Sequence, residues 1–114
     1  MEPFLPGILN HNKLPTAYPP TRDNVYSPLF MFYAWPGALL DDSLINGIKE
    51  SAKNIRDAAI TEGQDIKDAP LYPNYATFDT PLKEMYGDNV GELMLLKQRV
   101  DPTNIMGLAG GFRF

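Results

Sequence analysis

Apolar residues recur at steps of three and four between Asp41 and Glu62. Ile45, Ile48, Ala52, Ile55 and Ala59 form one stripe, and Lys49, Glu50, Lys53, Asn54, Arg56 and Asp57 occupy the opposite face. This period predicts an amphipathic helix that begins at Asp41 or Asp42 as its N-cap and stops at Gly63.

Two shorter helices are predicted in the last third of the chain. Thr80-Pro81 opens the first of them, and Gly87 closes it. Asp88 or Asn89 starts the second, which runs to about Arg99 before Asp101-Pro102 ends it. Its apolar side consists of Val90, Leu93, Leu96 and Val100. The glycine-rich tail from Ile105 to Phe114 predicts no regular structure.

The run from Leu29 to Trp35 is apolar and aromatic, and Pro28 and Pro36 bracket it. Continuous hydrophobicity of this length predicts a strand that is covered on both faces, with Phe32, Tyr33 and Trp35 packed in a core rather than stacked on a ligand. The predicted fold class is therefore α+β: a small α-rich domain with few strands, three helices and a proline-rich arm. Residues 1–27 are the arm, whose apolar side chains predict that it packs on something, and residues 28–114 are the domain.

A lone strand leaves unpaired N–H and C=O groups along both edges. The proline-rich arm is a poor source of a second strand, so we expect the run from Leu29 to Trp35 to pair with another copy or another chain. The expected assembly is a homo-oligomer, with a homodimer as its simplest form.

The composition of the chain excludes several classes of function. The 114 residues limit the chain to one domain with a modest core, and the net charge of −4 disfavours nucleic acid as a partner. Zero cysteines exclude disulfides and thiolate metal sites. No apolar run reaches the ~20 residues of a membrane span, and the start lacks the pattern of a secretory signal, so a cytoplasmic location is expected. His11, the single histidine, is expected in a solvated loop, and no metal site is predicted.

Three short motifs follow one another in the last third: Tyr72-Pro-Asn-Tyr75, Met85-Tyr-Gly-Asp-Asn89 and Lys97-Gln-Arg-Val-Asp101-Pro-Thr-Asn104. Their order and spacing resemble the carboxyl-terminal segment of berberine-bridge-enzyme-like FAD-linked oxidoreductases. Ala17-Tyr-Pro-Pro20, the run from Ser27 to Trp35, and Glu62-Gly-Gln-Asp65 resemble fungal members of the same family, which act in secondary metabolism. The resemblance implies the end of a flavoprotein oxidase substrate domain. It also implies that the FAD-binding domain lies outside these residues, so that no cofactor is expected to bind this chain alone.

The resemblance assigns roles to the first motif. Tyr72 is implied as an acid/base or substrate-binding group and Asn74 as a contact to the flavin. Tyr75, in the same motif, is a second catalytic candidate. A loop in which Pro73 fixes φ and Asn74 bonds local backbone is the structural alternative. Tyr86-Gly-Asp-Asn89 and Asp101-Pro-Thr-Asn104 are interpreted as helix boundaries.

Three functions stay open at this point. The chain is a truncated relative of the FAD-linked oxidoreductases, a stand-alone cofactor-free cyclase or isomerase with Tyr72, Asn74 and Tyr75 as anchors, or a non-catalytic subunit or gene-model fragment. The first two of these functions would require a small-molecule substrate.

Overall fold

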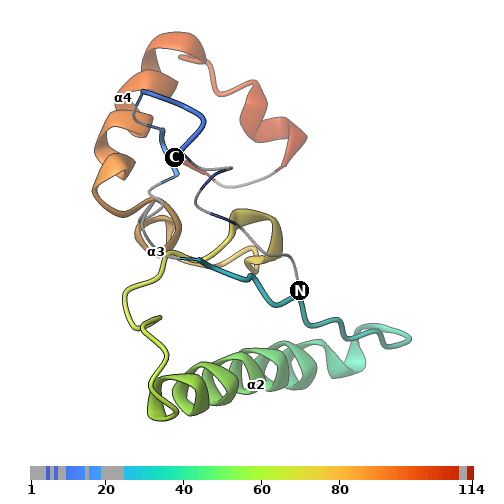
Figure 1. The fold of residues 1–114 in the computed structure, drawn as a ribbon. Coiled ribbons are helices and arrows are strands. Elements are labelled where there is room, and N and C mark those ends of the chain that lie inside the picture. Colours follow the sequence, from blue (N-terminus) through green and yellow to red (C-terminus); the bar gives the residue numbers. More distant parts are fainter. Residues whose placement is uncertain (1–4, 6, 8–9, 15, 19–24, 111–112) are drawn as a thin grey trace. The chain divides into compact units, whose positions relative to one another are not determined.

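The structure of the protein is a computed structural model that describes residues 5, 7, 10–14, 16–18, 25–110 and 113–114. It is helical, with 52% helix, 1% strand and no sheet among these residues (Figure 1). The predicted α+β class with few strands is therefore wrong. The described chain divides into two units, one of residues 29–69 and one that joins residues 70–114 to the described part of residues 2–28.

The long helix α2 spans Asp41–Thr61, close to the predicted bounds. Its end is as predicted: Glu62 is the C-cap, and Gly63 follows with a φ of 88°. Its start is not, because Leu40 is the N-cap and makes no side-chain capping bond. Asp41 lies inside the first turn, where its Oδ1 accepts a hydrogen bond from Trp35 Nε1 at 2.6 Å. A carboxylate in the first turn still stabilises the helix through the macrodipole.

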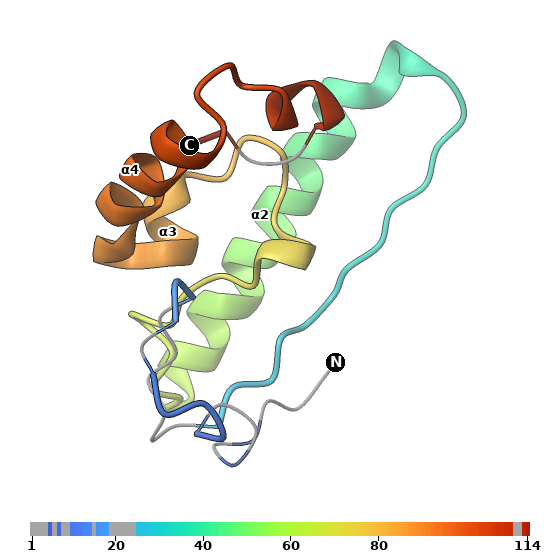
Figure 2. The same cartoon turned by 90° about the horizontal axis from the view of Figure 1, so that it is seen from above.

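The run from Leu29 to Trp35 is extended but forms no strand. It runs in the opposite direction to α2, to which Tyr33 is joined by a hydrogen bond of 3.2 Å between its Oη and Ser51 Oγ (Figure 2). Phe32 is 75% exposed and Tyr33 41% exposed, so the prediction that they pack in a core is also wrong. Aromatic composition favours a strand only where a neighbouring strand offers a ladder. The neighbour of this segment within its unit is a helix.

A short 3-10 helix, η1 (Ala38–Leu40), directly precedes α2, and residues 70–114 contain several further helices. The 3-10 helix η2 spans Pro73–Tyr75, α3 spans Leu82–Tyr86, and α4 spans Val90–Val100. A 3-10 turn at Gly87–Asn89 joins α3 to α4, and Gly87 adopts a φ of 56°, as its predicted role in ending a helix requires. The tail differs from the prediction, since Met106–Ala109 forms a 3-10 helix (η4).

Few side chains are buried. Met85 on α3 is the one large hydrophobic residue with no exposed surface among the described residues, and no residue of α2 or α4 is buried. The predicted modest core is therefore reduced to the surroundings of Met85. No helix in the described ranges has both the length and the hydropathy to cross a bilayer.

Candidate functional site

The Tyr72–Tyr75 loop is held by its own backbone. Tyr72 is the N-cap of η2 and Pro73 its first residue, where the fixed φ of proline suits a helical turn. The N–H of Tyr75 donates to the carbonyl of Tyr72 at 3.0 Å, and that of Ala76 donates to Pro73 at 3.3 Å. The tight turn brings the side chains of Tyr72 and Tyr75 to one side.

The side chains of this loop contact one another. Asn74 Nδ2 donates to the hydroxyl oxygen of Tyr72 at 2.7 Å. The rings of Tyr72 and Tyr75 pack edge to face, with centroids 5.1 Å apart and an interplanar angle of 84°. The structure therefore brings all three sequence-predicted site residues together, and it places Asn74 on the Tyr72 phenol rather than on local backbone.

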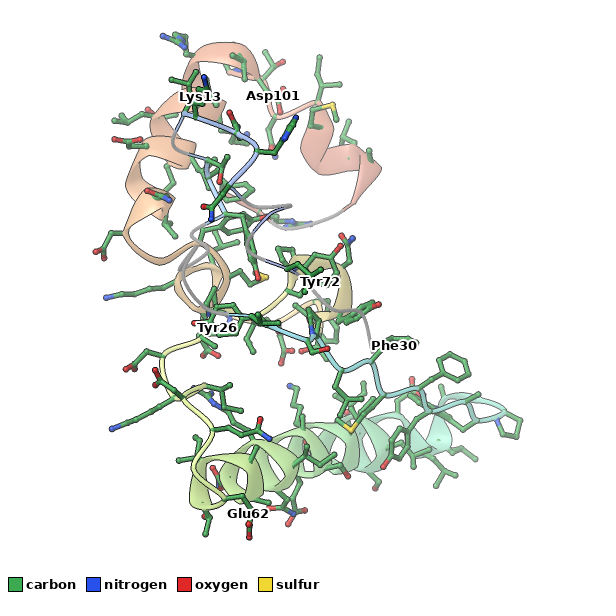
Figure 3. The ribbon with its side chains drawn as sticks, viewed as in Figure 1. Lys13, Tyr26, Phe30, Glu62, Tyr72 and Asp101 are labelled. Carbon is green, nitrogen blue, oxygen red and sulfur yellow. The ribbon has the colours of Figure 1, made fainter. Side chains whose placement is uncertain are left out.

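Tyr18 from the amino-terminal arm joins this cluster. Its ring lies 6.4 Å from that of Tyr72 at 72°, and its hydroxyl donates to the carbonyl of Pro70 at 3.5 Å. Burial raises the pKa of the Tyr18 phenol above 10.0, and the neighbouring phenols of Tyr72 and Tyr26 add to the shift. The prediction that the apolar residues of the arm pack holds for Tyr18 but not for Leu5 and Leu14, which are 52% and 69% exposed, while Phe4, Ile8 and Leu9 lie outside the described residues. Figure 3 shows Tyr72 with its side chain.

Two sets of hydrogen bonds hold the segments on either side of the cluster. The N–H of Leu71 donates to the carbonyl of Glu84 on α3 at 2.8 Å. Asn89, expected to cap α4, makes no capping bond, and its Nδ2 donates instead to the carbonyls of Thr16 and Ala17 at 3.3 and 3.0 Å. Asn89 thus ties the arm to the start of α4, a role that sequence reasoning missed.

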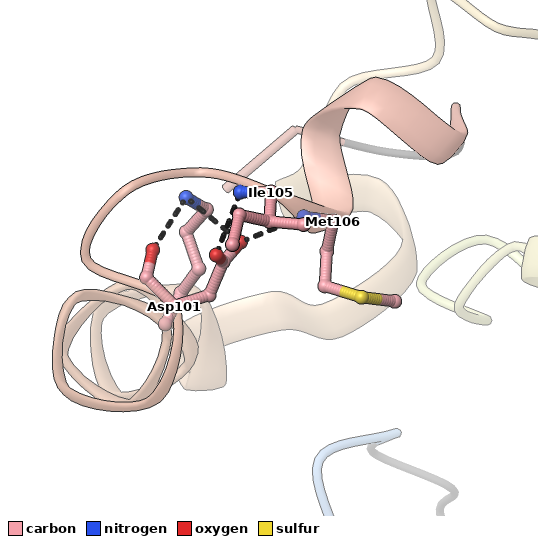
Figure 4. Close-up of polar contacts among 4 residues, drawn as sticks. Asp101, Ile105 and Met106 are labelled. Atoms are coloured by element: carbon pink, nitrogen blue, oxygen red, sulfur yellow. Dashed lines mark hydrogen bonds and ion pairs between the residues drawn. The ribbon is translucent and has the colours of Figure 1, made fainter.

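Asp101 fixes the exit of α4. Its carboxylate accepts hydrogen bonds from the N–H groups of Ile105 at 2.7 Å and Met106 at 3.2 Å, and Lys97 Nζ lies 3.6 Å from Oδ2 (Figure 4). Only 9% of Asp101 is exposed. This is the helix boundary that the sequence predicted, with the carboxylate as its organising group.

The comparisons with known proteins bear on this same region. Residues 71–109 match the family model described as berberine and berberine like. This match is consistent with a berberine-bridge-enzyme-like carboxyl-terminal region over residues 71–109. The matched residues begin with the Tyr72–Tyr75 loop and include α3, α4 and the Asp101 turn, all within one unit. Neither the curated proteins nor the solved structures gave a match.

The cofactor of the berberine-bridge-enzyme-like family provides a test of the described residues. FAD needs an anion site for its pyrophosphate, and the start of a helix is the common place for one. Both long helices carry acidic residues in the first turn. These are Asp41 and Asp42 in α2 and Glu92 in α4. Carboxylates repel a pyrophosphate, so the starts of α2 and α4 do not fit it.

The described residues also contain no group of three or more His, Asp and Glu side chains placed to hold a metal ion. His11 is exposed in a turn.

Proposed function

We propose that this chain contributes the Tyr72–Tyr75 loop to the small-molecule site of an FAD-linked oxidoreductase of the berberine-bridge-enzyme-like class. The observation that supports the proposal is the contact of Asn74 Nδ2 with the Tyr72 hydroxyl at 2.7 Å, in a loop that opens the matched segment. Together with the packing of the Tyr75 ring on Tyr72, this contact brings the three candidate site residues into one cluster.

Each residue has a role that its chemistry permits. The Tyr72 phenol both donates and accepts hydrogen bonds, so it can bind a substrate hydroxyl or exchange a proton with it. Asn74 orients that phenol through its amide and presents the amide plane to a flavin ring. Tyr75 packs at 84° to Tyr72 and supplies an apolar face for a substrate. Flavin supplies the redox chemistry when it is bound, while these residues bind and orient the small molecule.

We also propose that these residues do not hold FAD alone, because the acidic starts of α2 and α4 oppose its pyrophosphate. A cofactor-free cyclase or isomerase would use the same loop, but no contact of the structure favours that alternative over the first.

An NMR titration with riboflavin tests the assignment of the loop. Riboflavin carries the flavin ring without a pyrophosphate, so it probes the ring contact alone. We expect the largest chemical-shift changes at the side-chain amide of Asn74 and the backbone of residues 72–75. Asn74→Ala and Tyr72→Phe should abolish or weaken these changes without altering the far-ultraviolet circular dichroism, because Asn74 is exposed in the short turn η2 between α2 and α3.

Asn54→Ala is the matched control, since Asn54 is exposed on α2 in the other unit. It should leave the titration unchanged. Shift changes that centre on α2, or that persist in Asn74→Ala, contradict the proposal.

A further inference from the structure

One face of α4 carries an open depression that lies apart from the tyrosine cluster. Its lining is Glu92, Leu95, Leu96 and Arg99. Leu95 is 68% exposed and Leu96 44% exposed. Adjacent leucines that are exposed to this degree give this face apolar surface that association would bury.

The four residues share one side of the helix. They are spaced by three, one and three residues, which at 3.6 residues per turn places them within one stripe. Val90, Leu93 and Lys97 are only partly exposed and lie on the opposite side. The helix therefore turns its less exposed side to its own unit and its leucine pair outwards.

The two charges of the depression do not meet within one copy. Glu92 and Arg99 are seven residues apart, which is about 10 Å along the helix axis. Neither forms an ion pair with another residue that the structure describes. Each charge is therefore available to a partner that carries the opposite charge at the matching position along the helix axis.

The α4 of a second copy, placed antiparallel to the first, carries the opposite charge at each of these two positions. With a two-fold axis between Leu95 and Leu96, Glu92 comes opposite Arg99 of the partner subunit, and Arg99 opposite the partner's Glu92. The leucines of both copies meet at the axis, and the two helix dipoles oppose each other favourably. We propose that this face of α4 pairs with the same face of a second copy of the chain, as an isologous dimer contact.

This contact is independent of the proposed function and differs from the strand pairing that the sequence suggested. A single helix pair buries less than the ~1,200–2,000 Å² of a standard interface. We therefore expect a weak dimer, with a Kd on the order of 10–100 μM.

Charge exchange tests the contact. Glu92→Arg places two guanidinium groups together at both ends of the interface, and Arg99→Glu places two carboxylates together. Each single variant should dimerise at least about tenfold more weakly than the wild type in sedimentation equilibrium. An equimolar mixture of the two variants restores opposite-charge pairing across the interface, so it should form a heterodimer. The variant that carries both exchanges should recover the wild-type Kd to within about threefold.

Lys83→Glu, on the exposed surface of α3, is the control and should dimerise as the wild type does. Circular dichroism checks the helix content of each variant. If a charge variant loses helix, Leu95→Gln takes its place, because it removes an exposed leucine without touching a charge and should also weaken the dimer.

The proposal is overturned by a wild-type mass that stays monomeric up to about 500 μM, well above the expected Kd. Single variants that associate as the wild type does also overturn it, as does a mixture that is no heavier than its components.

Discussion

Replacement of Asp101 by alanine should destabilise the end of the segment that matches the family model more than any other single-charge change there. The carboxylate is 9% exposed and accepts two backbone N–H groups, those of Ile105 and Met106, at 2.7 and 3.2 Å. In Asp101→Ala both N–H groups lose their acceptor, and Lys97 loses its counter-ion.

The size of the effect follows from these contacts. A hydrogen bond to a charged group contributes about 1.5–3 kcal/mol, and the longer of the two bonds should contribute less than the shorter. The pair with Lys97 adds about 0–1 kcal/mol, because at 3.6 Å with a lysine side chain that is 25% exposed it is partly screened. We expect a loss of about 2–4 kcal/mol for Asp101→Ala and about 1–2 kcal/mol for Asp101→Asn, which keeps one acceptor oxygen.

Urea unfolding and amide hydrogen exchange measure this loss globally and locally. The amides of Ile105 and Met106 should exchange at least about 30-fold faster in Asp101→Ala, as a local loss of ~2 kcal/mol requires. Asp88→Ala is the matched control, since Asp88 is an exposed acid in the turn before α4. If Asp101→Ala unfolds within about 0.5 kcal/mol of the wild type and both amides keep their protection, the carboxylate does not hold this turn.

Two further predictions concern the tyrosine cluster and the core. Because burial raises the pKa of Tyr18 above 10.0, its neutral form stabilises the fold fully below that pH, and this contribution is lost as the pH rises through the folded-state pKa. Tyr18→Phe should therefore remove a phenol that titrates above pH 10.0 from the absorbance at 295 nm, and an unchanged alkaline end of the curve would refute the assignment. Met85→Ala should cost about 2–5 kcal/mol in urea unfolding, because Met85 has no exposed surface. Met94→Ala, 45% exposed on α4, should cost far less, and equal losses would show that Met85 is not the centre of the core.

The helices could be predicted from the sequence because their signals are local. Each signal lies within one or two turns of the helix that it predicts. These signals are the three-and-four period of α2, Gly63 after its end, and Gly87 between α3 and α4. The Tyr72–Tyr75 loop was predicted for the same reason: four consecutive residues carry both its turn chemistry and its resemblance to the family.

The errors arose where a residue depends on a distant partner. The segment from Leu29 to Trp35 has the composition of a strand, but α2 is its neighbour within the unit. Asn89 matches the preference for an N-cap, yet its amide bonds the carbonyls of Thr16 and Ala17, which are more than 70 residues away. No local pattern distinguishes a capping asparagine from one that ties down an arm.

The central proposal is that the Tyr72–Tyr75 loop contacts the flavin ring, whereas the starts of α2 and α4 offer no site for the pyrophosphate. Calorimetric titration with riboflavin and with FAD tests both halves at once. We predict similar, weak affinities for the two ligands, with a Kd in the millimolar range, and loss of binding in Asn74→Ala. FAD that binds at least about 100-fold more tightly than riboflavin would contradict the claim by revealing a pyrophosphate site, and a Kd that Asn74→Ala leaves unchanged would contradict the role of the loop.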